Sequence, residues 1–394
     1  MNDSHQIAEI LITFGGLFLI GLLADLIGRH TLLPRVTVLL LAGFMIGPSM
    51  FDWLPPFTEE WFPVLTDVAL AMIGFLLGQK LTLKTLRTMG RPVLTMSIGE
   101  VVLTSLLVFS VLSLFGVPVI VALLLAGIAP ATDPAATVDV VREYSAKGKF
   151  TDTLLGIVAI DDVWGLFIFS ILLAIAQALS GQNVAGEVLA SAAWEIGGAL
   201  LLGLLLGIPM AYITGRIRPG EPTQAEALGL ILLGAGLGVW AGVSYILTAM
   251  MMGAVVANVA KHHERAFHTI EGIEWPFMIL FFLLAGAALQ VEALQQVGLM
   301  GAGYILLRVT GRVIGTRLGG WLGGAEASTR HWMGLALLPQ AGVAIGMALL
   351  ASQHFPDLKD IILPMALGST VIFELLGPIV SRRVLIHIGE VKND

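Results

Sequence analysis

Residues 152–179 read DTLLGIVAIDDVWGLFIFSILLAIAQAL, a long apolar run with two adjacent aspartates, Asp161 and Asp162, near its middle. An α-helix needs about 20 mostly apolar residues to cross a bilayer, and this run exceeds that length. At 1.5 Å per residue, the aspartates lie roughly 15 Å deep. Because a charge inside a bilayer is costly, ionisable residues at such a depth are usually functional. The segment therefore predicts a membrane helix with an acidic site at its centre.

The whole chain has the composition of a membrane protein. Its 394 residues are 57% hydrophobic and only 12% charged, with a mean hydropathy of +0.90. Soluble domains carry about 25% charged residues, so most of this chain is expected to lie in lipid. The absence of cysteine excludes disulfides and thiolate metal sites. An acidic start and a long apolar run after it indicate a retained span rather than a cleavable signal peptide.

Apolar segments along the chain predict an all-α polytopic membrane protein with thirteen spans. The eighth and ninth spans are the least distinct, because only Gly242-Val243-Ser244 separates them. The predicted spans are 7–27, 33–51, 61–80, 92–115, 118–142, 152–179, 187–214, 224–242, 244–260, 275–290, 297–319, 328–353 and 360–387.

The basic residues test this count, because cytoplasmic loops of membrane proteins carry an excess of Lys and Arg. If the odd-numbered spans run from outside to inside, every basic residue except Lys359, Arg308 and Arg312 falls in an inner loop or the tail. The outer segments instead hold acidic residues such as Glu187 and Glu292. We therefore expect a multi-pass protein of the cell inner (plasma) membrane, with its N-terminus outside and its C-terminus in the cytoplasm.

Short patterns recur at a nearly constant offset. Gly47, which ends LAGFMIG, matches Gly253, which ends TAMMMG, 206 residues later. FLLG at 75–78 matches FLLAG at 282–286, at an offset of 207 to 208. The shared offset predicts two six-helix repeats, spans 1–6 and 8–13, joined by the seventh span. Because one copy starts outside and the other inside, the repeats are inverted, which is a hallmark of secondary transporters.

Two of the predicted spans are interrupted near their middle. The fifth contains Thr132-Asp133-Pro134-Ala135 and the twelfth contains Leu338-Pro339-Gln340, with the prolines 205 residues apart. Proline breaks a helix, and Asp before Pro is a good start for a second half-helix. Two such breaks would direct freed backbone groups at one point in the membrane. Asp133 could compensate the positive helix N-termini there, and Arg308 the opposed carbonyl ends.

The two central aspartates have different expected surroundings. Adjacent helical residues point about 100° apart, so Asp161 and Asp162 cannot face the same partner. One can pair with a buried cation, for which Arg308 is the obvious candidate, while the other faces a water-filled cavity. Arginine stays protonated, so it cannot easily carry a transported proton. The free carboxylate can hold either a proton or a hard cation, and that competition is the chemistry of antiport.

Glu100, Arg312 and Glu374 also lie inside predicted spans. For these three we favour charge compensation between helices over a direct role in transport. Glu100 and Arg312 are candidate partners of each other, because their helices are equivalent in the two repeats. For Asp161 and Asp162 we favour a direct role in transport, because two adjacent carboxylates are more than one arginine needs for charge compensation.

The remaining motifs exclude several classes of protein. The chain carries no nucleotide-binding loop, zinc motif or nucleic-acid signature, so we expect no cofactor, no nucleic-acid partner and no ATP-driven pumping. An intramembrane aspartyl protease would place its acids on separate helices, so we do not expect an enzyme. The histidine-rich segment 261–268 is read as a solvated loop rather than a pH sensor or metal site. A sodium-coupled organic-anion symporter is the alternative, and a channel or sensor is a third reading.

Several stretches resemble the monovalent cation:proton antiporter-2 family. Residues 33–48 and GFLLG at 74–78 resemble its opening, and AIDDVWG at 159–165 resembles its double-aspartate motif. RVTGRVIG at 308–315 resembles its basic helix, and FELLGP at 373–378 its last span. The likeness covers nearly the whole chain, and the double aspartate within thirteen spans is its specific part.

The resemblance implies a sodium/proton antiporter fold in which a core moves like an elevator against a scaffold that forms a homodimer. By position, Asp162 would bind the ion, Asp161 would pair with Arg308, and Thr132 would line the site. Some double-aspartate members have Lys where Arg308 stands, which could change the coupling ratio. The implied division is dimer-domain helices in 1–91 and 224–296, core-domain helices in 92–182 and 297–387, a linker helix in 183–223 and a cytoplasmic tail in 388–394.

Together these features predict an antiporter that exchanges Na⁺ or Li⁺, with K⁺ as a further candidate, for H⁺. Two aspartates favour an electrogenic exchange. Membrane lipid would surround the protein, and pH homeostasis is the expected physiological role.

Overall fold

The computed structural model describes residues 3–30, 33–79, 81–181, 185–214, 223–260, 263–288, 292–340 and 342–391. These residues form fifteen α-helices and one 3₁₀ turn, with no strand among them. The helices are α1 (Asp3–His30), α2 (Arg35–Ile46), α3 (Phe57–Gly78), α4 (Leu83–Leu114), α5 (Val119–Ile128), α6 (Pro134–Glu143), α7 (Lys149–Leu179), α8 (Ala185–Thr214), α9 (Thr223–Ala241), α10 (Tyr245–Val259), α11 (His263–Ala287), α12 (Glu292–Gly323), α13 (Ala327–Ala336), α14 (Gly342–His354) and α15 (Lys359–Ile388), with the 3₁₀ turn η1 at Pro356–Leu358.

The helices follow the predicted segments in chain order. Eight of the described helices are long and apolar enough to cross a membrane, and four shorter ones are apolar as well. The fifth segment is split into α5 and α6, and the twelfth into α13 and α14. Gly242, with a φ of 66°, separates α9 from α10, and the side chain of Ser244 caps α10. The all-helical polytopic fold with two interrupted segments is confirmed, whereas thirteen crossings stay a prediction.

Helices α2, α3, α10 and α11 pack with the symmetry of inverted repeats. α2 packs on α11, and α3 packs on α10. Gly43 and Gly286 meet the opposite backbone at the first contact, and Gly78 and Gly253 at the second. A Cβ at any of these four glycines would come within 2.0–2.2 Å of a backbone oxygen, so only glycine allows the approach. Because the predicted repeat equates α2 with α10 and α3 with α11, the two contacts are copies of each other.

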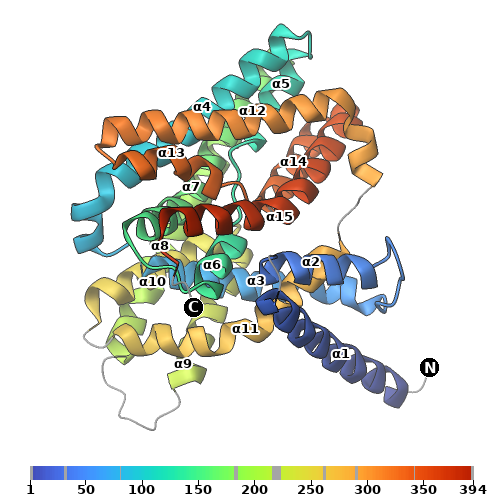
Figure 1. Ribbon diagram of the computed structural model, residues 1–394, viewed down its shortest axis with the longest axis vertical. Coiled ribbons are helices and arrows are strands. Elements are labelled where there is room, and N and C mark those ends of the chain that lie inside the picture. Colours follow the sequence, from blue (N-terminus) through green and yellow to red (C-terminus); the bar gives the residue numbers. More distant parts are fainter. Residues whose placement is uncertain are drawn as a thin grey trace.

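The equivalent helices α4 and α12 pack against each other along their length. Figure 1 shows them side by side in the upper part of the molecule, where α13 and α15 pack on α12, and α14 packs on α15. α1, α2, α9 and α11 lie in the lower part, and α6 lies between the two groups. α6 contacts α2 and α3 as well as α7 and α15. α6, the second half of the interrupted fifth segment, therefore lies where the two groups of helices meet.

Candidate functional site

The two interrupted segments cross at their breaks. The backbone N–H of Asp133 donates a hydrogen bond of 3.0 Å to the carbonyl oxygen of Pro339. The Asp133 carboxylate accepts from the backbone N–H of Ala135 at 2.9 Å and so caps α6, which begins at Pro134. The Asp-Pro pair thus starts a second half-helix, as the sequence indicated. Gln340, from the other break, is fully buried at the crossing.

Two fully buried arginines of α12 hold the carbonyl ends of α5 and α13. The last carbonyls of a helix lack partners within it and carry partial negative charge, so a guanidinium is a suitable partner. This matches the expectation that Arg308 balances the opposed carbonyl ends. Arg308 donates to the carbonyls of Ala129 at 2.9 Å, Ala131 at 2.8 Å and Leu338 at 3.1 Å, and Arg312 donates to those of Ala131 at 2.9 Å, Pro130 and Leu337.

The implied pairing of Asp161 with Arg308 is wrong for this structure. Asp161 instead accepts a hydrogen bond of 2.6 Å from the hydroxyl of Ser97 on α4. The reason is that the two helix breaks leave carbonyl oxygens without backbone donors. The Arg308 guanidinium donates to these oxygens and is therefore not available to Asp161. The second predicted pair does form, since Arg312 Nε lies 3.2 Å from Glu100 Oε1. Asp161 therefore belongs to a buried polar cluster between α4, α7 and α12.

Asp162 faces the other way, into a cavity of about 620 Å³. Thr132 and Asp133 from the first break, and Glu374 from α15, line the same cavity. Asp162 is 8% exposed, and its Oδ1 has no hydrogen-bond partner among the described residues. The separation of the aspartates agrees with the 100° turn between neighbouring helical residues. Of the two aspartates, Asp162 is thus the one that a solute in the cavity can reach.

The cavity extends from Asp162 toward the face predicted to be extracellular. Its lining includes Glu195 of α8, Ser244 at the start of α10, Ala288 after α11 and Leu350 of α14. Each of these residues lies toward a predicted outer loop. The Asp162 carboxylate is therefore accessible from one face of the molecule through a mostly apolar cavity.

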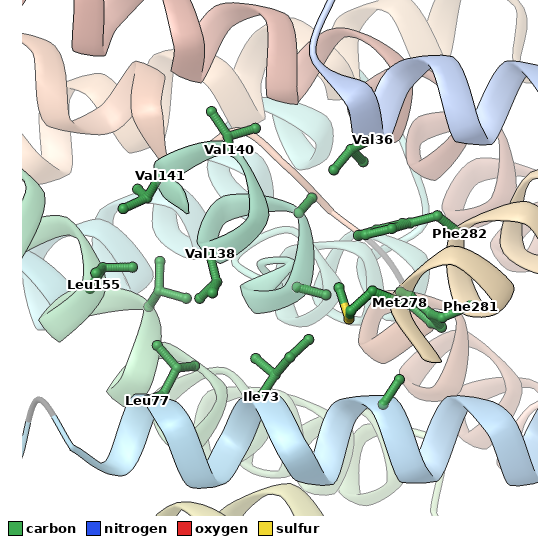
Figure 2. Packing of buried hydrophobic residues seen from close by; sticks show 14 of the residues in the cluster. Val36, Ile73, Leu77, Val138, Val140, Val141, Leu155, Met278, Phe281 and Phe282 are labelled. Carbon is green, nitrogen blue, oxygen red and sulfur yellow. The ribbon is translucent and has the colours of Figure 1, made fainter. Parts of the chain in front are cut away.

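The opposite side of Asp162 is closed by apolar packing, which we call the inner plug. Figure 2 shows side chains of α6 between those of α3 and α11, with α7 at the other edge. The plug residues of α3 and α6 lie at the predicted cytoplasmic ends of these helices, and that of α7 lies near the start of its helix. The inner plug consists of Ile73 and Leu77 of α3, Val138 and Val141 of α6, Leu155 of α7 and Met278 of α11.

Charged contacts next to the inner plug join α6 to α2 and α11, and we call them the inner latch. The Arg35 guanidinium forms an ion pair with Asp139, with Nε donating at 2.8 Å. The backbone N–H of Arg35, at the start of α2, donates to the Glu143 carboxylate at 2.9 Å. Arg142 of α6 forms an ion pair with Glu274 of α11. The latch therefore holds the end of α6 on both neighbouring helices.

Glu143 ends α6, just beyond the predicted fifth span. Burial raises the pKa of Glu143 to about 7, and the charge of Asp139 adds to the shift. The hydrogen bond from the Arg35 N–H, together with the Arg35 charge, opposes the rise. The latch thus contains a carboxyl group that titrates near neutral pH.

A second cavity, of about 410 Å³, lies at the predicted cytoplasmic face. It is lined by both apolar and charged residues, including Leu77, Arg142, Lys147 and Asp152. It shares no lining residue with the first cavity. Leu77 belongs to the inner plug, so the plug separates this cavity from the one that contains Asp162.

Several predicted features lie partly outside the described residues. These include Lys261 and His262 of the histidine-rich segment, the end of the tail from 392 to 394, and residues 215–222 of the linker. His268, within the described part, lies 3.1 Å from Glu271 through its Nδ1. The segment therefore contributes a surface contact on α11, and its predicted solvated character stays a prediction.

Sequence reasoning missed several polar residues of the site. Ser97 lies one helical turn before Glu100 on α4, and Thr370 one turn before Glu374 on α15, so their spacing from a buried acid was an available signal. Asp139 and Glu143 are likewise one turn apart on α6. Their partner Arg35 is more than 100 residues away in sequence, which no local pattern indicates.

With this geometry established, comparison with known proteins identifies the family. The model of the family described as "Sodium/hydrogen exchanger, transmembrane" matches residues 10–386. The chain therefore belongs to the sodium/hydrogen exchanger family of membrane proteins.

Individual relatives are distant but cover most of the chain. The ammonium/H⁺ antiporter subunit AmhT of Alkalihalophilus pseudofirmus is 22% identical over 377 residues, which is 94% of each chain. An uncharacterised Na⁺/H⁺ exchanger of Mycobacterium tuberculosis is 24% identical over 402 residues, which covers 92% of this chain and 72% of that protein. Two structures of the sodium proton antiporter MjNhaP1 from Methanocaldococcus jannaschii share the fold. One, at pH 8, has a TM-score of 0.68, 20% identity and 96% coverage of both chains, and the other has 0.78, 18% and 100%.

Proposed function

We propose that the protein is a secondary active antiporter that exchanges a monovalent cation for protons, with Asp162 as the shared binding group. The observation that carries the proposal is the Asp162 carboxylate, nearly buried in a cavity with one oxygen unpartnered. A buried carboxylate without a fixed cation is costly, so it binds either a proton or a cation. Family membership agrees with this chemistry.

The charge of the cavity favours a cation over an organic anion as the substrate. Asp133, Asp162, Glu195 and Glu374 all contribute to the lining, whereas no Lys, Arg or His is among the described lining residues. An anion would be repelled by these carboxylates and would find no basic side chain to bind. We therefore prefer the antiporter to the sodium-coupled organic-anion symporter.

Na⁺ or Li⁺ is the favoured cation, because carboxylate and hydroxyl oxygens suit small hard cations. Thr132 contributes a hydroxyl to the cavity that contains Asp162. K⁺ stays a candidate, and the name of the relative AmhT adds ammonium to the cations that need testing.

The proposed mechanism is alternating access by an elevator movement. Helices α4–α7 and α12–α15, in 92–182 and 297–387, would form the moving core. Helices α1–α3 and α9–α11, in 1–91 and 224–296, would form the scaffold and dimer interface. The cavity and the inner latch both lie between these groups, which supports relative movement there. In the conformation described, Asp162 would exchange ions with the outside.

A proteoliposome assay with a pH-sensitive dye tests the proposal. An imposed pH gradient is followed while Li⁺, Na⁺, K⁺, Rb⁺ or ammonium is added. The wild type should dissipate the gradient with at least one cation, and Asp162→Asn should lose this response. Asp360→Asn, an exposed acid on α15, is the matched control and should retain it. If Asp162→Asn dissipates the gradient as the wild type does, the role of Asp162 is wrong.

A further inference from the structure

The helix that carries the two central aspartates is not capped by a side chain at its own N-cap position. α7 begins after Gly148, which has no side chain to accept a hydrogen bond from the first turn. The first backbone N–H groups of a helix need partners from outside the helix. The Glu390 carboxylate accepts from the N–H groups of Phe150 at 2.9 Å and Thr151 at 2.7 Å, and from the Thr151 hydroxyl at 2.7 Å. A carboxylate at this position also interacts favourably with the positive end of the helix dipole.

Glu390 lies just beyond α15, so this cap joins two helices that are far apart in sequence. Gly389 follows α15, and its φ of 79° is a left-handed conformation that glycine adopts readily and that ends the helix. The carbonyl oxygen of Glu390 accepts from the backbone N–H of Lys147 at 3.0 Å, which holds the residue against the loop before α7. We call the contacts of Glu390 with residues 147–151 the tail strap.

α7 and α15 both line the cavity that is proposed to bind the cation. α7 contributes Asp162, and α15 contributes Thr370 and Glu374. Among the described residues, both helices pack on α5, α6, α13 and α14 rather than extensively on each other. The tail strap therefore connects directly two helices that otherwise meet mainly through their neighbours.

A displacement at the start of α7 would reach Asp162. Asp162 lies eleven residues beyond Thr151, roughly 17 Å along the same helix at 1.5 Å per residue. α7 contains no proline, which is the commonest cause of a sharp kink, so the helix can transmit an axial shift along its length.

We infer that Glu390 is a positioning residue of the cation site, because the tail strap fixes the axial position of α7 relative to α15. This inference rests on the proposed function. Without the strap, the first turn of α7 loses its cap and its connection to α15, and Asp162 can shift relative to the groups that α15 contributes. A binding site has to be held to within about 0.5 Å of its productive geometry, so cation binding should weaken.

Gly148 offers a variant that separates the strap from simple capping. The three atoms nearest to a Cβ built at Gly148 all belong to the Glu390 side chain, and Glu390→Ala removes them. An aspartate at this N-cap position can then accept from the first turn of α7. The double variant Glu390→Ala/Gly148→Asp thus restores the cap but not the connection to α15.

The dye assay and thermal unfolding in detergent test the inference on the intact protein. Glu390→Ala should raise the apparent KM for the cation roughly fivefold and lower the unfolding midpoint, with little change in the maximal rate. The double variant should regain the midpoint but keep the raised KM. Glu390→Gln retains one acceptor oxygen and should give a smaller rise in KM, so it provides the test if Glu390→Ala does not assemble.

Glu326→Ala is the matched control. The exposed ion pair of Glu326 with Lys149, at 3.0 Å, also reaches the start of α7, and its loss should leave KM and the midpoint unchanged. Recovery of the wild-type KM by the double variant would show that capping alone matters and would overturn the inference. An unchanged KM in Glu390→Ala would overturn it as well.

A distance measurement distinguishes failure of this inference from failure of the proposed function. Because the chain has no cysteine, spin labels can be placed on single cysteines at the exposed positions Phe167 of α7 and Leu376 of α15. The distance distribution should broaden or shift in Glu390→Ala and in the double variant. A distribution that stays as in the wild type would overturn the inference even if transport falls. Absence of any cation response in the wild type would instead overturn the proposed function, whereas the distances would still show whether the strap positions α7.

Discussion

The two sides of the helix crossing share α3, α7 and α11 but have opposite character. On the predicted outer side, α7 and α15 turn Asp162 and Glu374 into a cavity of about 620 Å³. On the predicted inner side, α6 packs its valines against α3 and α11, and its charged end is paired with α2 and α11. Polar groups are left for solutes on one side and are mutually satisfied on the other.

This difference indicates how the conformation with a closed inner face can be favoured and yet remain reversible. The inner plug removes apolar surface from water, which stabilises the closed inner face. The inner latch is partly exposed, and ion pairs of that kind contribute modestly to stability. If the plug and latch stabilise the closed inner face by only about a few kcal/mol, a bound cation or proton can shift the equilibrium between the closed and open inner faces.

The largest effect is expected from breaking the crossing that both sides share. Arg312→Met leaves Glu100 buried without its cation and frees the carbonyls at the breaks. Losing one partner of a buried ion pair costs about 3–5 kcal/mol. Thermal unfolding in detergent should therefore show a marked fall in the midpoint. Arg317→Met, at an exposed position of the same helix, should change it little, and equal falls in both would contradict this account.

A smaller effect is expected from thinning the inner plug. Leu155→Ala removes buried methyl groups and should destabilise the closed inner face by about 2–4 kcal/mol. The second cavity should then connect with that of Asp162 more often. Because the chain has no cysteine, a single cysteine at Val138 reports this opening by its rate of maleimide labelling. Unchanged labelling in the Leu155→Ala background would show that the plug does not close the path.

The inner latch should contribute less than the plug. Asp139→Asn removes the charge that pairs with the Arg35 guanidinium, and we expect about 1–2 kcal/mol for a partly buried pair. Spin labels on cysteines introduced in α2 and α6 would measure the population in which these helices separate. The exposed pair of Lys149 and Glu326 supplies the control, since Lys149→Gln should leave the distances unchanged. If Lys149→Gln separated α2 and α6 more often than Asp139→Asn does, the inner latch would have no part in the proposed movement.

At pH 7 the smallest effect is the contribution of Glu143 to the latch, because a carboxyl group that is half protonated in the latched conformation contributes only about 0.4 kcal/mol there. Its pKa is raised to about 7 in the latched conformation and would return toward its ordinary value of about 4.3 once α6 is released into water. The latched conformation therefore binds the proton more tightly, so its advantage is complete below about pH 4.3 and is lost as the pH rises to about 7. The ratio of released to latched protein, measured from the same spin-label distances, should rise by less than tenfold per pH unit, because one proton is involved. Glu143→Gln should flatten this slope, and an unchanged slope would assign the dependence to another group.

Local sequence patterns determined much of the fold and part of the site. Apolar run lengths predicted the helices in order, and the Asp133-Pro134 pair predicted where α6 starts. The 100° turn between neighbours predicted that Asp161 and Asp162 face different surroundings. These features depend on residues close in the chain, whose relative positions a helix already sets.

Only the tertiary structure decided which partners the buried charges have. Arg308 holds carbonyl groups rather than Asp161, and Asp161 takes the hydroxyl of Ser97, 64 residues away. Arg35 and Asp139, 104 residues apart, meet because α2 and α6 pack at one particular rotation. Such rotations follow from close helix contacts like that of Gly43 on α11, and the spacing of residues within one helix does not encode them. The sequence by itself thus determined the class of protein and the central position of its two aspartates in a long apolar helix, whereas packing decided which face of that site is open.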